Sequence, residues 1–350
     1  MKYIFSSLII LLILVPPSIN RNFGDTISKP VKLQDSTNDG PYVLFRNDSV
    51  IEFTIINNEV QKKVLDPDGV QTSFEVEPSI YENIERLAVL SDVHGQYNLT
   101  SILLKNNGIV DDQLNWNYGD GHLVIVGDIF DRGPQVTELF WLVYTLEQQA
   151  EKAGGKVHFT LGNHEYMVMN NDLRYINRKY RVTERLLETS YDQLYNENTL
   201  LGRWLRSKNT VLKINDHLFV HAGISPEFID HDFDLDNTNA QMRKSLDSKL
   251  TAAQRDSIYN KFYNAYGPIW YRGYFNDDLK KGVVKRLLKK LNVSQIIVGH
   301  TSQPRIMSFF NNKIMAVDTS IKNGINGEVL FIEKGIFYRG KLDGSREIID

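Results

Sequence analysis

The chain has 350 residues, of which 42% are hydrophobic and 24% charged, so it can bury a substantial core and its bulk is not disordered. The formal net charge of −3 provides no strong field for nucleic acid, and we expect no nucleic-acid partner. The chain contains no cysteine, which excludes disulfides, a thiol nucleophile and thiolate-bound metals; any metal must take nitrogen and oxygen ligands.

The first 20 residues differ from the rest of the chain. Lys2 precedes a mostly apolar stretch over residues 3–15, which two prolines follow, and this pattern predicts a secretory signal peptide. The stretch is shorter than the ~20 residues that a membrane-spanning helix needs. Because no clear cleavage site follows, an uncleaved N-terminal anchor that tethers the protein to a membrane is the alternative. We expect an exported protein, periplasmic or associated with the cell envelope.

Two short regions precede the main domain. Residues 21–40 are polar and predict a linker. Residues 41–80 carry alternating β-branched runs, interrupted at Asn47-Asp48, Asn57-Asn58 and Asp66-Pro-Asp-Gly69, which predicts a small β region built of hairpins. This region could cap a pocket or pack behind the main sheet.

From residue 84 onward, short apolar runs alternate with longer amphipathic segments, which predicts an α/β domain. The apolar runs suit strands buried on both faces, and they cover residues 87–90, 123–126, 157–161, 218–220 and 296–298. Helices are predicted over residues 135–153, 182–201 and 279–291. Residues 230–256 are polar and show no assignable element.

Each apolar run leads into a glycine-containing turn that bears Asp, Asn or His. The turns read Ser91-Asp-Val-His-Gly95, Gly127-Asp-Ile-Phe-Asp-Arg-Gly133, Gly162-Asn-His-Glu165, His221-Ala-Gly-Ile-Ser-Pro226 and Gly299-His-Thr301. Side chains at the carboxyl ends of neighbouring strands point into one shared crevice. We therefore expect these turns to build a single site.

The ligand-type residues of these turns exceed the needs of one metal ion. They are Asp92, His94, Asp128, Asn163, His221 and His300. Two ions that share one carboxylate would use all six, and Asp128 is the natural bridge because it heads the central motif. Two divalent cations outweigh two aspartates in charge, and the surplus can hold a hydroxide and a phosphate. Mn, Fe or Zn suits such ligands, and Mn is our first expectation.

Further residues of the same turns suit phosphoryl chemistry. Arg132 follows the bridging motif and can fork onto phosphate oxygens, and Arg272 is a second candidate for this role. His164 can protonate the leaving oxygen while Asp131 holds its ring nitrogen. Glu165 suits a supporting partner better than a catalytic acid.

A single histidine of this kind is more often a core residue than a ligand, and the prediction depends on five motifs in order. The remaining histidines, His122, His158, His217 and His231, are interpreted as structural. Asp172, Arg174 and Tyr175 either line the pocket or belong to a plain loop.

As a set, these motifs resemble those of the calcineurin-like metallophosphoesterases, and most closely the phosphoprotein phosphatase branch. The resemblance covers roughly residues 84–335 and implies a four-layer αββα sandwich over a domain of residues 84–340. It implies that one metal is held by Asp92, His94 and Asp128, and the other by Asp128, Asn163, His221 and His300. It also implies the roles given above for His164, Asp131, Arg132 and Arg272.

Two departures narrow the resemblance. Leu161 stands where eukaryotic Ser/Thr phosphatases of this branch have an arginine, and Ala316-Val-Asp-Thr-Ser320 replaces their Ser-Ala-Pro-Asn-Tyr. With Gly267-Pro-Ile-Trp-Tyr-Arg-Gly273, these features resemble the bacterial Shewanella-like protein phosphatases, which include phosphotyrosine-preferring members.

The resemblance implies a metal-dependent phosphomonoesterase that acts on phosphoproteins, with a hydroxide bridging two metals as the nucleophile. One alternative is a hydrolase of dinucleoside polyphosphates or another small phosphoester, since the same core would serve it. Another is a non-enzymatic envelope scaffold with a vestigial metal site. A DNA-processing esterase fits the acidic charge balance least.

Overall fold

The structure is a computed structural model that describes residues 36–47, 49–230, 233–246, 250–276 and 279–349. Residues from Thr37 onward form one compact unit. The predicted signal peptide or anchor, the tether over residues 3–15 and most of the linker lie outside the described residues. In the part of the chain that the structure describes, no helix is long and apolar enough to cross a membrane.

The hairpins predicted before the main domain form a three-stranded antiparallel sheet. Its strands are β1 (Asp39–Arg46), β2 (Ser49–Ile56) and β3 (Glu59–Leu65). Asn57 and Asn58 join β2 to β3 as a two-residue loop and both have positive φ, which asparagine tolerates and a type I′ turn requires. β1 begins at Asp39, within the segment expected to be linker.

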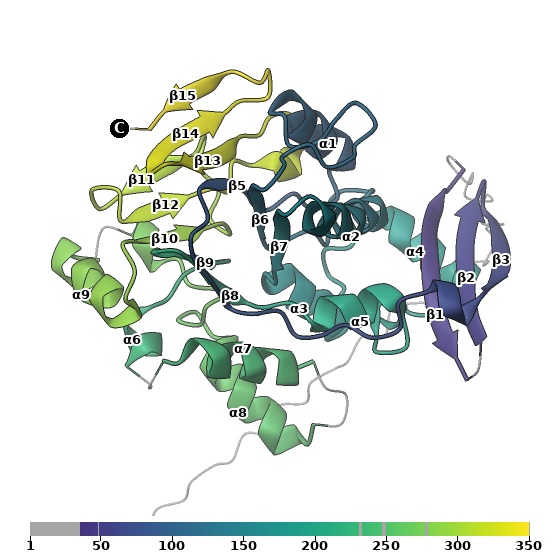
Figure 1. Cartoon of the computed structure of the whole chain (residues 1–350). Coiled ribbons are helices and arrows are strands. Elements are labelled where there is room, and N and C mark those ends of the chain that lie inside the picture. Colours follow the sequence, from purple (N-terminus) through teal and green to yellow (C-terminus); the bar gives the residue numbers. More distant parts are fainter. Residues whose placement is uncertain (1–35, 48, 231–232, 247–249, 277–278, 350) are drawn as a thin grey trace, which may run out of the picture. The chain divides into compact units, whose positions relative to one another are not determined.

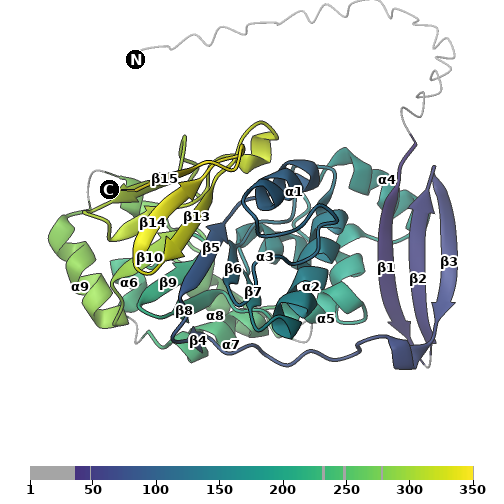
Figure 2. The same cartoon turned by 45° about the horizontal axis from the view of Figure 1, so that its top comes forward.

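This small sheet packs against helices and lines none of the metal cavity. Figure 2 shows β1–β3 beside α2 (Val136–Lys152), α4 (Arg178–Leu187) and α5 (Leu200–Arg206). The Trp141 indole donates to the Pro41 carbonyl at 2.8 Å, and the Phe45 N–H donates to the Asn198 carbonyl at 2.8 Å. The small sheet therefore does not cap the metal cavity, which was one of the two positions that the sequence allowed.

Over the described residues, two six-stranded sheets pack face to face (Figure 1). The first runs β15 (Arg346–Ile348), β14 (Ile336–Gly340), β13 (Val329–Glu333), β5 (Arg86–Leu90), β6 (His122–Val126), β7 (Lys156–Thr160). The second runs β11 (Met307–Phe309), β12 (Ile314–Ala316), β10 (Gln295–Val298), β9 (His217–Val220), β8 (Val211–Ile214), β4 (Ile80–Tyr81). The five predicted strands are β5, β6, β7, β9 and β10, and β15 extends the first sheet beyond residue 340.

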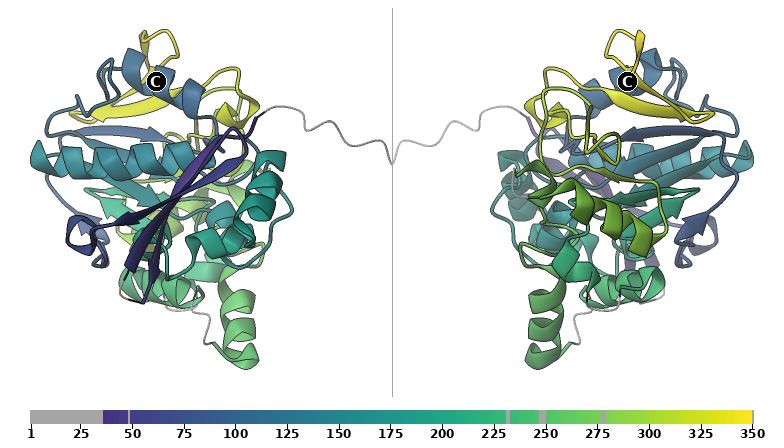
Figure 3. Two further views of the ribbon diagram at one scale, coloured as in Figure 1. Left: turned by 90° about the vertical axis from the view of Figure 1, so that its right-hand side faces the viewer. Right: turned by 90° about the vertical axis from the view of Figure 1, so that its left-hand side faces the viewer.

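The two sheets enclose an apolar core, and helices cover their outer faces. Leu87 and Val124 of the first sheet belong to one buried cluster with Leu212 and Ile297 of the second. The first sheet's outer face carries α1 (Tyr97–Asn106) and α2, and the second carries α6 (Pro226–Ile229), α7 (Leu235–Lys244) and α9 (Lys281–Leu291) (Figure 3). This arrangement confirms the four-layer sandwich and explains the continuous apolar runs, since both faces of the strands are buried.

Two of the three predicted helices are confirmed as α2 and α9, but the helix over residues 182–201 is wrong. The chain leaves α4 at Glu188, whose φ of 52° is left-handed, and α5 begins only at Leu200. Thr199 caps α5 by accepting the Gly202 N–H at 3.1 Å, so a polar side chain replaces the helical hydrogen bond there. The unassigned polar segment contains α7 and the first turns of α8 (Ala252–Phe262).

Candidate metal centre

The six predicted ligands come together at the carboxyl ends of the parallel strands. All are buried, with exposed fractions from 0% for His221 to 6% for His300. Asp92 and His94 follow β5, Asp128 follows β6, Asn163 begins α3 (Asn163–Met169) after β7, and His221 and His300 follow β9 and β10. The prediction that the five turns build one site is confirmed in its geometry.

The backbone of these turns adopts conformations that non-glycine residues rarely take. Positive φ angles occur at Asp92 (53°), His94 (41°), Asp128 (61°) and His300 (63°). Such angles are uncommon outside glycine, and they concentrate at functional sites where the surrounding structure enforces them. The sharp reversals after the strands turn these side chains toward a common point.

Close packing explains why glycine accompanies the ligands in two of the turns. A Cβ at Gly162 would lie 2.3 Å from Oδ1 of Asp128. A Cβ at Gly299 would lie 2.4 Å from Oδ2 of Asp92 and 2.0 Å from the Ser91 hydroxyl. Because no side chain fits at either position, glycine lets the neighbouring carboxylates sit against the backbone.

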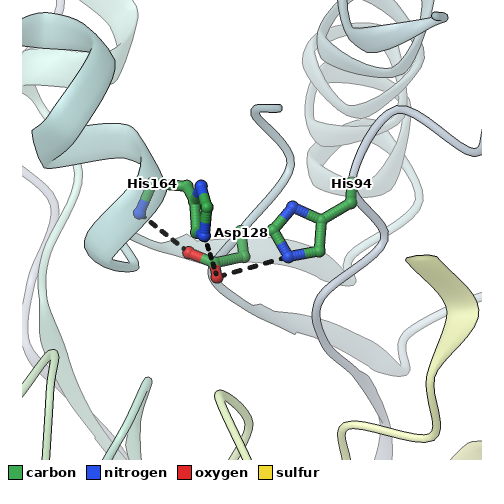
Figure 4. A group of neighbouring side chains, drawn as sticks. All are labelled: His94, Asp128 and His164. Atoms are coloured by element: carbon green, nitrogen blue, oxygen red, sulfur yellow. Dashed lines mark hydrogen bonds and ion pairs between the residues drawn. The ribbon is translucent and has the colours of Figure 1, made fainter. Parts of the chain in front are cut away.

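One group of ligand-type atoms gathers at the Asp128 carboxylate. Oδ2 of Asp128 lies 3.5 Å from Nε2 of His94 and 3.8 Å from Nε2 of His164. Figure 4 shows the three side chains pointing toward one another. The other ring nitrogen of His94, Nδ1, lies 2.7 Å from the Phe130 carbonyl and donates to it, which leaves Nε2 as the acceptor that faces the site.

A second group of ligand-type atoms shares the same carboxylate. Nε2 of His221 is 3.2 Å from Oδ2 of Asp128, 2.9 Å from Oδ1 of Asn163 and 3.2 Å from Nδ1 of His300. Ligands of a tetrahedral ion with bonds of ~2.0–2.1 Å are separated by about 3.3 Å, so these spacings fit a metal ion.

The chemistry of this second group requires a positive charge. His221 donates from Nδ1 to the Val126 carbonyl at 2.8 Å, so Nε2 presents its lone pair to the oxygens of Asp128 and Asn163. Burial lowers the pKa of His221, but the charge of Asp128 outweighs this and raises the pKa to about 10. A cation between these acceptors would supply the charge that the proton otherwise brings, and the residues therefore fit a metal ion.

Asp92 lies in the site but is oriented differently from the other carboxylate. Its Oδ2 accepts from the Ser91 hydroxyl at 2.5 Å and from the His300 N–H at 2.9 Å, while Oδ1 lies 3.9 Å from Nε2 of His94. Burial and the nearby charge of Asp318 raise the pKa of Asp92 to about 8. The geometry groups His164, rather than Asp92, with His94 and Asp128, so the role of Asp92 as a metal ligand stays a prediction.

His164 and Asp131 are paired as the sequence predicts. Nδ1 of His164 donates a short hydrogen bond to Oδ2 of Asp131, and both side chains are buried. Burial lowers the pKa of His164, but the charges of Asp128 and Asp131 outweigh this and raise it above its ordinary value. The arrangement directs a protonated Nε2 toward the cavity, as a general acid requires.

Both predicted arginines line a cavity of about 210 Å³ that the candidate metal ligands also line. Nε of Arg132 donates to Nε2 of His94 at 3.3 Å. Arg272 donates from Nη1 to the His300 carbonyl at 3.1 Å and to the Thr301 hydroxyl at 3.0 Å. Neither guanidinium pairs with a carboxylate among the described residues, so both keep donors for a phosphate.

The remaining walls of the cavity include residues that the sequence left open or missed. The sequence left open whether Tyr175 lines the pocket or belongs to a plain loop, and in the structure it lines this cavity. Trp270, Ser302 and Lys322 also line the cavity and were not anticipated. Lys322 lies two residues after the segment Ala316–Ser320, and only the fold brings it beside the candidate metal ligands.

Residues outside this cavity have other partners. Arg174 binds Asp172 through two hydrogen bonds of 2.8 and 2.7 Å. His122 and His158 bind each other at 2.9 Å in β6 and β7, and His217 packs against a phenylalanine ring, in agreement with structural roles. His231 lies outside the described residues.

Three known proteins resemble this chain over most of its length. The crystal structure of a cold-active protein-tyrosine phosphatase from a psychrophilic Shewanella species matches with a TM-score of 0.85 and 41% identity, covering 89% of this chain and 99% of that one. An uncharacterized protein of Schizosaccharomyces pombe is 31% identical over 280 residues, which is 72% of this chain and 81% of the relative. Shewanella-like protein phosphatase 2 of Arabidopsis thaliana is 23% identical over 305 residues, 74% and 77% of the two chains.

The family assignment agrees with the geometry. Residues 85–304, well over half of the chain, match the calcineurin-like phosphoesterase family. This span contains all six predicted ligands and both groups of converging His and Asp atoms. The chain therefore belongs to the calcineurin-like phosphoesterases and is a metallophosphoesterase.

Proposed function

We propose that this enzyme is an exported phosphoprotein phosphatase that prefers phosphotyrosine and works with two divalent cations, manganese first among them. The observation that carries the proposal is the pair of ligand groups that share Asp128 beneath a cavity walled by Arg132 and Arg272. Similarity to a Shewanella protein-tyrosine phosphatase over nearly the whole of both chains supports the substrate class.

Asp128 would be a ligand that the two metal ions share. His94, with Asp92 or His164, would complete one site, and the other would take Asn163, His221 and His300. Two bound divalent cations would lower the pKa of a water molecule and neutralise phosphate charge. Imidazole, carboxylate and amide ligands without thiolate suit manganese, iron or zinc.

The chain's own residues orient the phosphate and supply a proton. Arg132 and Arg272 would grip its outer oxygens with their forked N–H groups. His164, held by Asp131, would deliver the proton of Nε2 to the leaving oxygen. For a phosphotyrosine substrate this oxygen belongs to the phenol, which departs as a neutral tyrosine side chain.

Export rests on a separate observation, the apolar residues 3–15 after Lys2. We infer that they direct the chain across a membrane and serve either as a cleaved signal or as a tether. Cell fractionation with N-terminal sequencing tests this inference. Recovery of the protein in the cytoplasm with its first residue intact would contradict it.

The function is tested by turnover of three substrates by the purified full chain with added manganese. A phosphotyrosine peptide is expected to react fastest, ahead of the same peptide with phosphoserine, and ahead of a dinucleoside tetraphosphate. Hydrolysis of the dinucleotide alone would overturn the substrate class and favour the small-molecule phosphoesterase. Inactivity on all three across manganese, iron and zinc would favour the scaffold alternative.

A further inference from the structure

A second cavity, of about 280 Å³, opens beside the metal cavity. The two cavities share Asn163 and Trp270 as walls. The second cavity lies between α3 and α8. Of the six predicted metal ligands, Asn163 alone lines it. A substrate whose phosphate lies among the metal ligands therefore has this cavity next to it.

The second cavity offers a flat aromatic surface. Tyr259 is 59% exposed, and its ring stacks on the half-buried Tyr263 with centroids 5.5 Å apart and an angle of 15°. Met167 and Ile258 add apolar walls. A stacked, exposed tyrosine on the wall of a cavity is suited to packing the apolar part of a ligand.

The same surface carries an arginine that has no counter-ion among the described residues. Arg255 lies one helical turn before Tyr259 on α8 and lines the cavity. No ion pair joins it to a carboxylate in the described parts of the chain. Arg174, on the same cavity, differs because Asp172 already occupies its donors. Arg255 lines the cavity with a guanidinium that can offer a fork of N–H donors to an anionic ligand.

The charge around both cavities favours an acidic ligand. Arg132, Arg272 and Lys322 line the metal cavity, and Arg255 lines its neighbour, although the whole chain has a net charge of −3. The carboxylates of the metal cavity are the candidate metal ligands, whose charge the cations would neutralise. Locally positive walls on an acidic protein select a negatively charged substrate.

We propose that this cavity is a specificity subsite for an acidic residue, glutamate above all, one or two positions from the phosphotyrosine of the substrate. The methylene groups of the glutamate pack on Tyr259, and its carboxylate binds Arg255. An extended chain advances about 3.3–3.6 Å per residue, so a side chain at this spacing reaches a cavity that shares walls with the phosphate site. The proposal rests on the proposed phosphotyrosine phosphatase function.

The test compares kcat/KM for three phosphotyrosine peptides that carry glutamate, alanine or lysine beside the phosphotyrosine. It uses the manganese-loaded full chain, the charge reversal Arg255→Glu and the matched control Lys261→Glu. Lys261 lies on the same helix but does not line the cavity. p-Nitrophenyl phosphate, which has no neighbouring residue, reports the metal centre alone.

The wild-type enzyme and Lys261→Glu are expected to prefer the glutamate peptide over the lysine peptide about fivefold. Arg255→Glu should abolish or reverse this preference without changing turnover of p-nitrophenyl phosphate. Equal rates on the three peptides, or the same preference in Arg255→Glu, would overturn the subsite while leaving the phosphatase function in place. If Arg255→Glu lowers kcat/KM only for a dinucleoside tetraphosphate, the subsite for an acidic residue would be overturned in favour of a nucleotide-binding cavity. Wild-type inactivity on every phosphotyrosine substrate would instead refute the proposed function.

Discussion

The carboxylate of Glu165 accepts a hydrogen bond from the backbone N–H of Asp128 at 2.9 Å. It also accepts from the N–H groups of Ile129, Phe130 and Gly162, at 2.8, 3.2 and 2.8 Å. One fully buried side chain thus holds the turn after β6 to the turn after β7. Glu165 therefore positions Asp128, the proposed shared metal ligand, and has no oxygen left for acid catalysis.

Replacing Glu165 with glutamine is expected to destabilise the protein by about 2–4 kcal/mol, because an NH₂ group would face backbone donors. Metal affinity should fall about 10- to 100-fold, as for other partners of ligating groups. Urea unfolding and calorimetric manganese titration measure the two effects. Glu151→Gln, at an exposed ion pair, is the control. Wild-type stability and metal affinity in Glu165→Gln would contradict this role.

Asp128 is the residue that both groups of candidate metal ligands share. Because its Oδ2 belongs to both, Asp128→Asn should bind neither ion tightly, whereas His221→Asn should lose only one. Elemental analysis of protein equilibrated with manganese and desalted checks the prediction, with Asp120→Asn, at an exposed ion pair, as the control. Two ions per chain in Asp128→Asn would rule out the shared carboxylate.

His164 has two candidate roles that one variant can separate. If His164 is the general acid, the variant His164→Asn should retain both ions, and its kcat for phosphotyrosine should fall about 10²- to 10⁴-fold. p-Nitrophenyl phosphate should be less affected, because its leaving group needs less protonation. The distance of 3.8 Å between Nε2 of His164 and Oδ2 of Asp128 also allows His164 to be a metal ligand. In that case His164→Asn should lose one ion. Metal content decides between the roles, and loss of one ion would refute the acid.

Lys322 adds a third cation to the walls of the metal cavity. Its ammonium group lies 3.4 Å from Oδ2 of the fully buried Asp318, which also accepts from the Ser302 hydroxyl at 2.6 Å. This anchor holds Lys322 at the cavity, so Lys322→Met should raise KM about five- to tenfold with a smaller effect on kcat. Steady-state kinetics measures the effect, and the exposed Lys334→Met should match wild type. An unchanged KM in Lys322→Met would contradict the prediction.

The His122–His158 pair predicts loss of stability in acid. Burial lowers the pKa of His122 to about 4 and that of His158 well below its ordinary value. The unfolded chain, with histidine pKa near ~6.5, therefore binds protons first as the pH falls. Stability is fully present above about pH 6.5 and is lost toward pH 4. Urea unfolding across this window should show a flatter pH dependence in His158→Gln than in wild type, and an equal slope would contradict the assignment.

The sequence predicted the strands and the ligands because each left a local pattern. Buried parallel strands such as β6 read as unbroken apolar runs, and Asn57-Asn58 marked a hairpin turn. The ligands stood in turns directly after such runs, so the fold that joins neighbouring strand ends also joins the ligands. Recognition of the motifs supplied the remaining layers of the sandwich.

Features that depend on distant parts of the chain were not predictable in this way. The helix expected over residues 182–201 breaks because Glu188 adopts a left-handed conformation and Thr199 caps a new helix, and neither residue type compels a break. Lys322 reaches the metal cavity only because a turn places it beside Ser302. The second cavity, with Arg255 and Tyr259, depends on where the fold places α8 relative to α3, and no local sequence pattern records this.

The central claim is that Asp128 joins two metal sites in a working phosphatase. Turnover of a phosphotyrosine peptide by the full chain and by Asp128→Asn, each treated with chelator and then resupplied with manganese, tests it most directly. The account predicts that the chelator abolishes wild-type turnover, that manganese restores it, and that Asp128→Asn stays inactive throughout. Turnover that persists at the wild-type rate in Asp128→Asn, or in the chelated enzyme, would contradict the account.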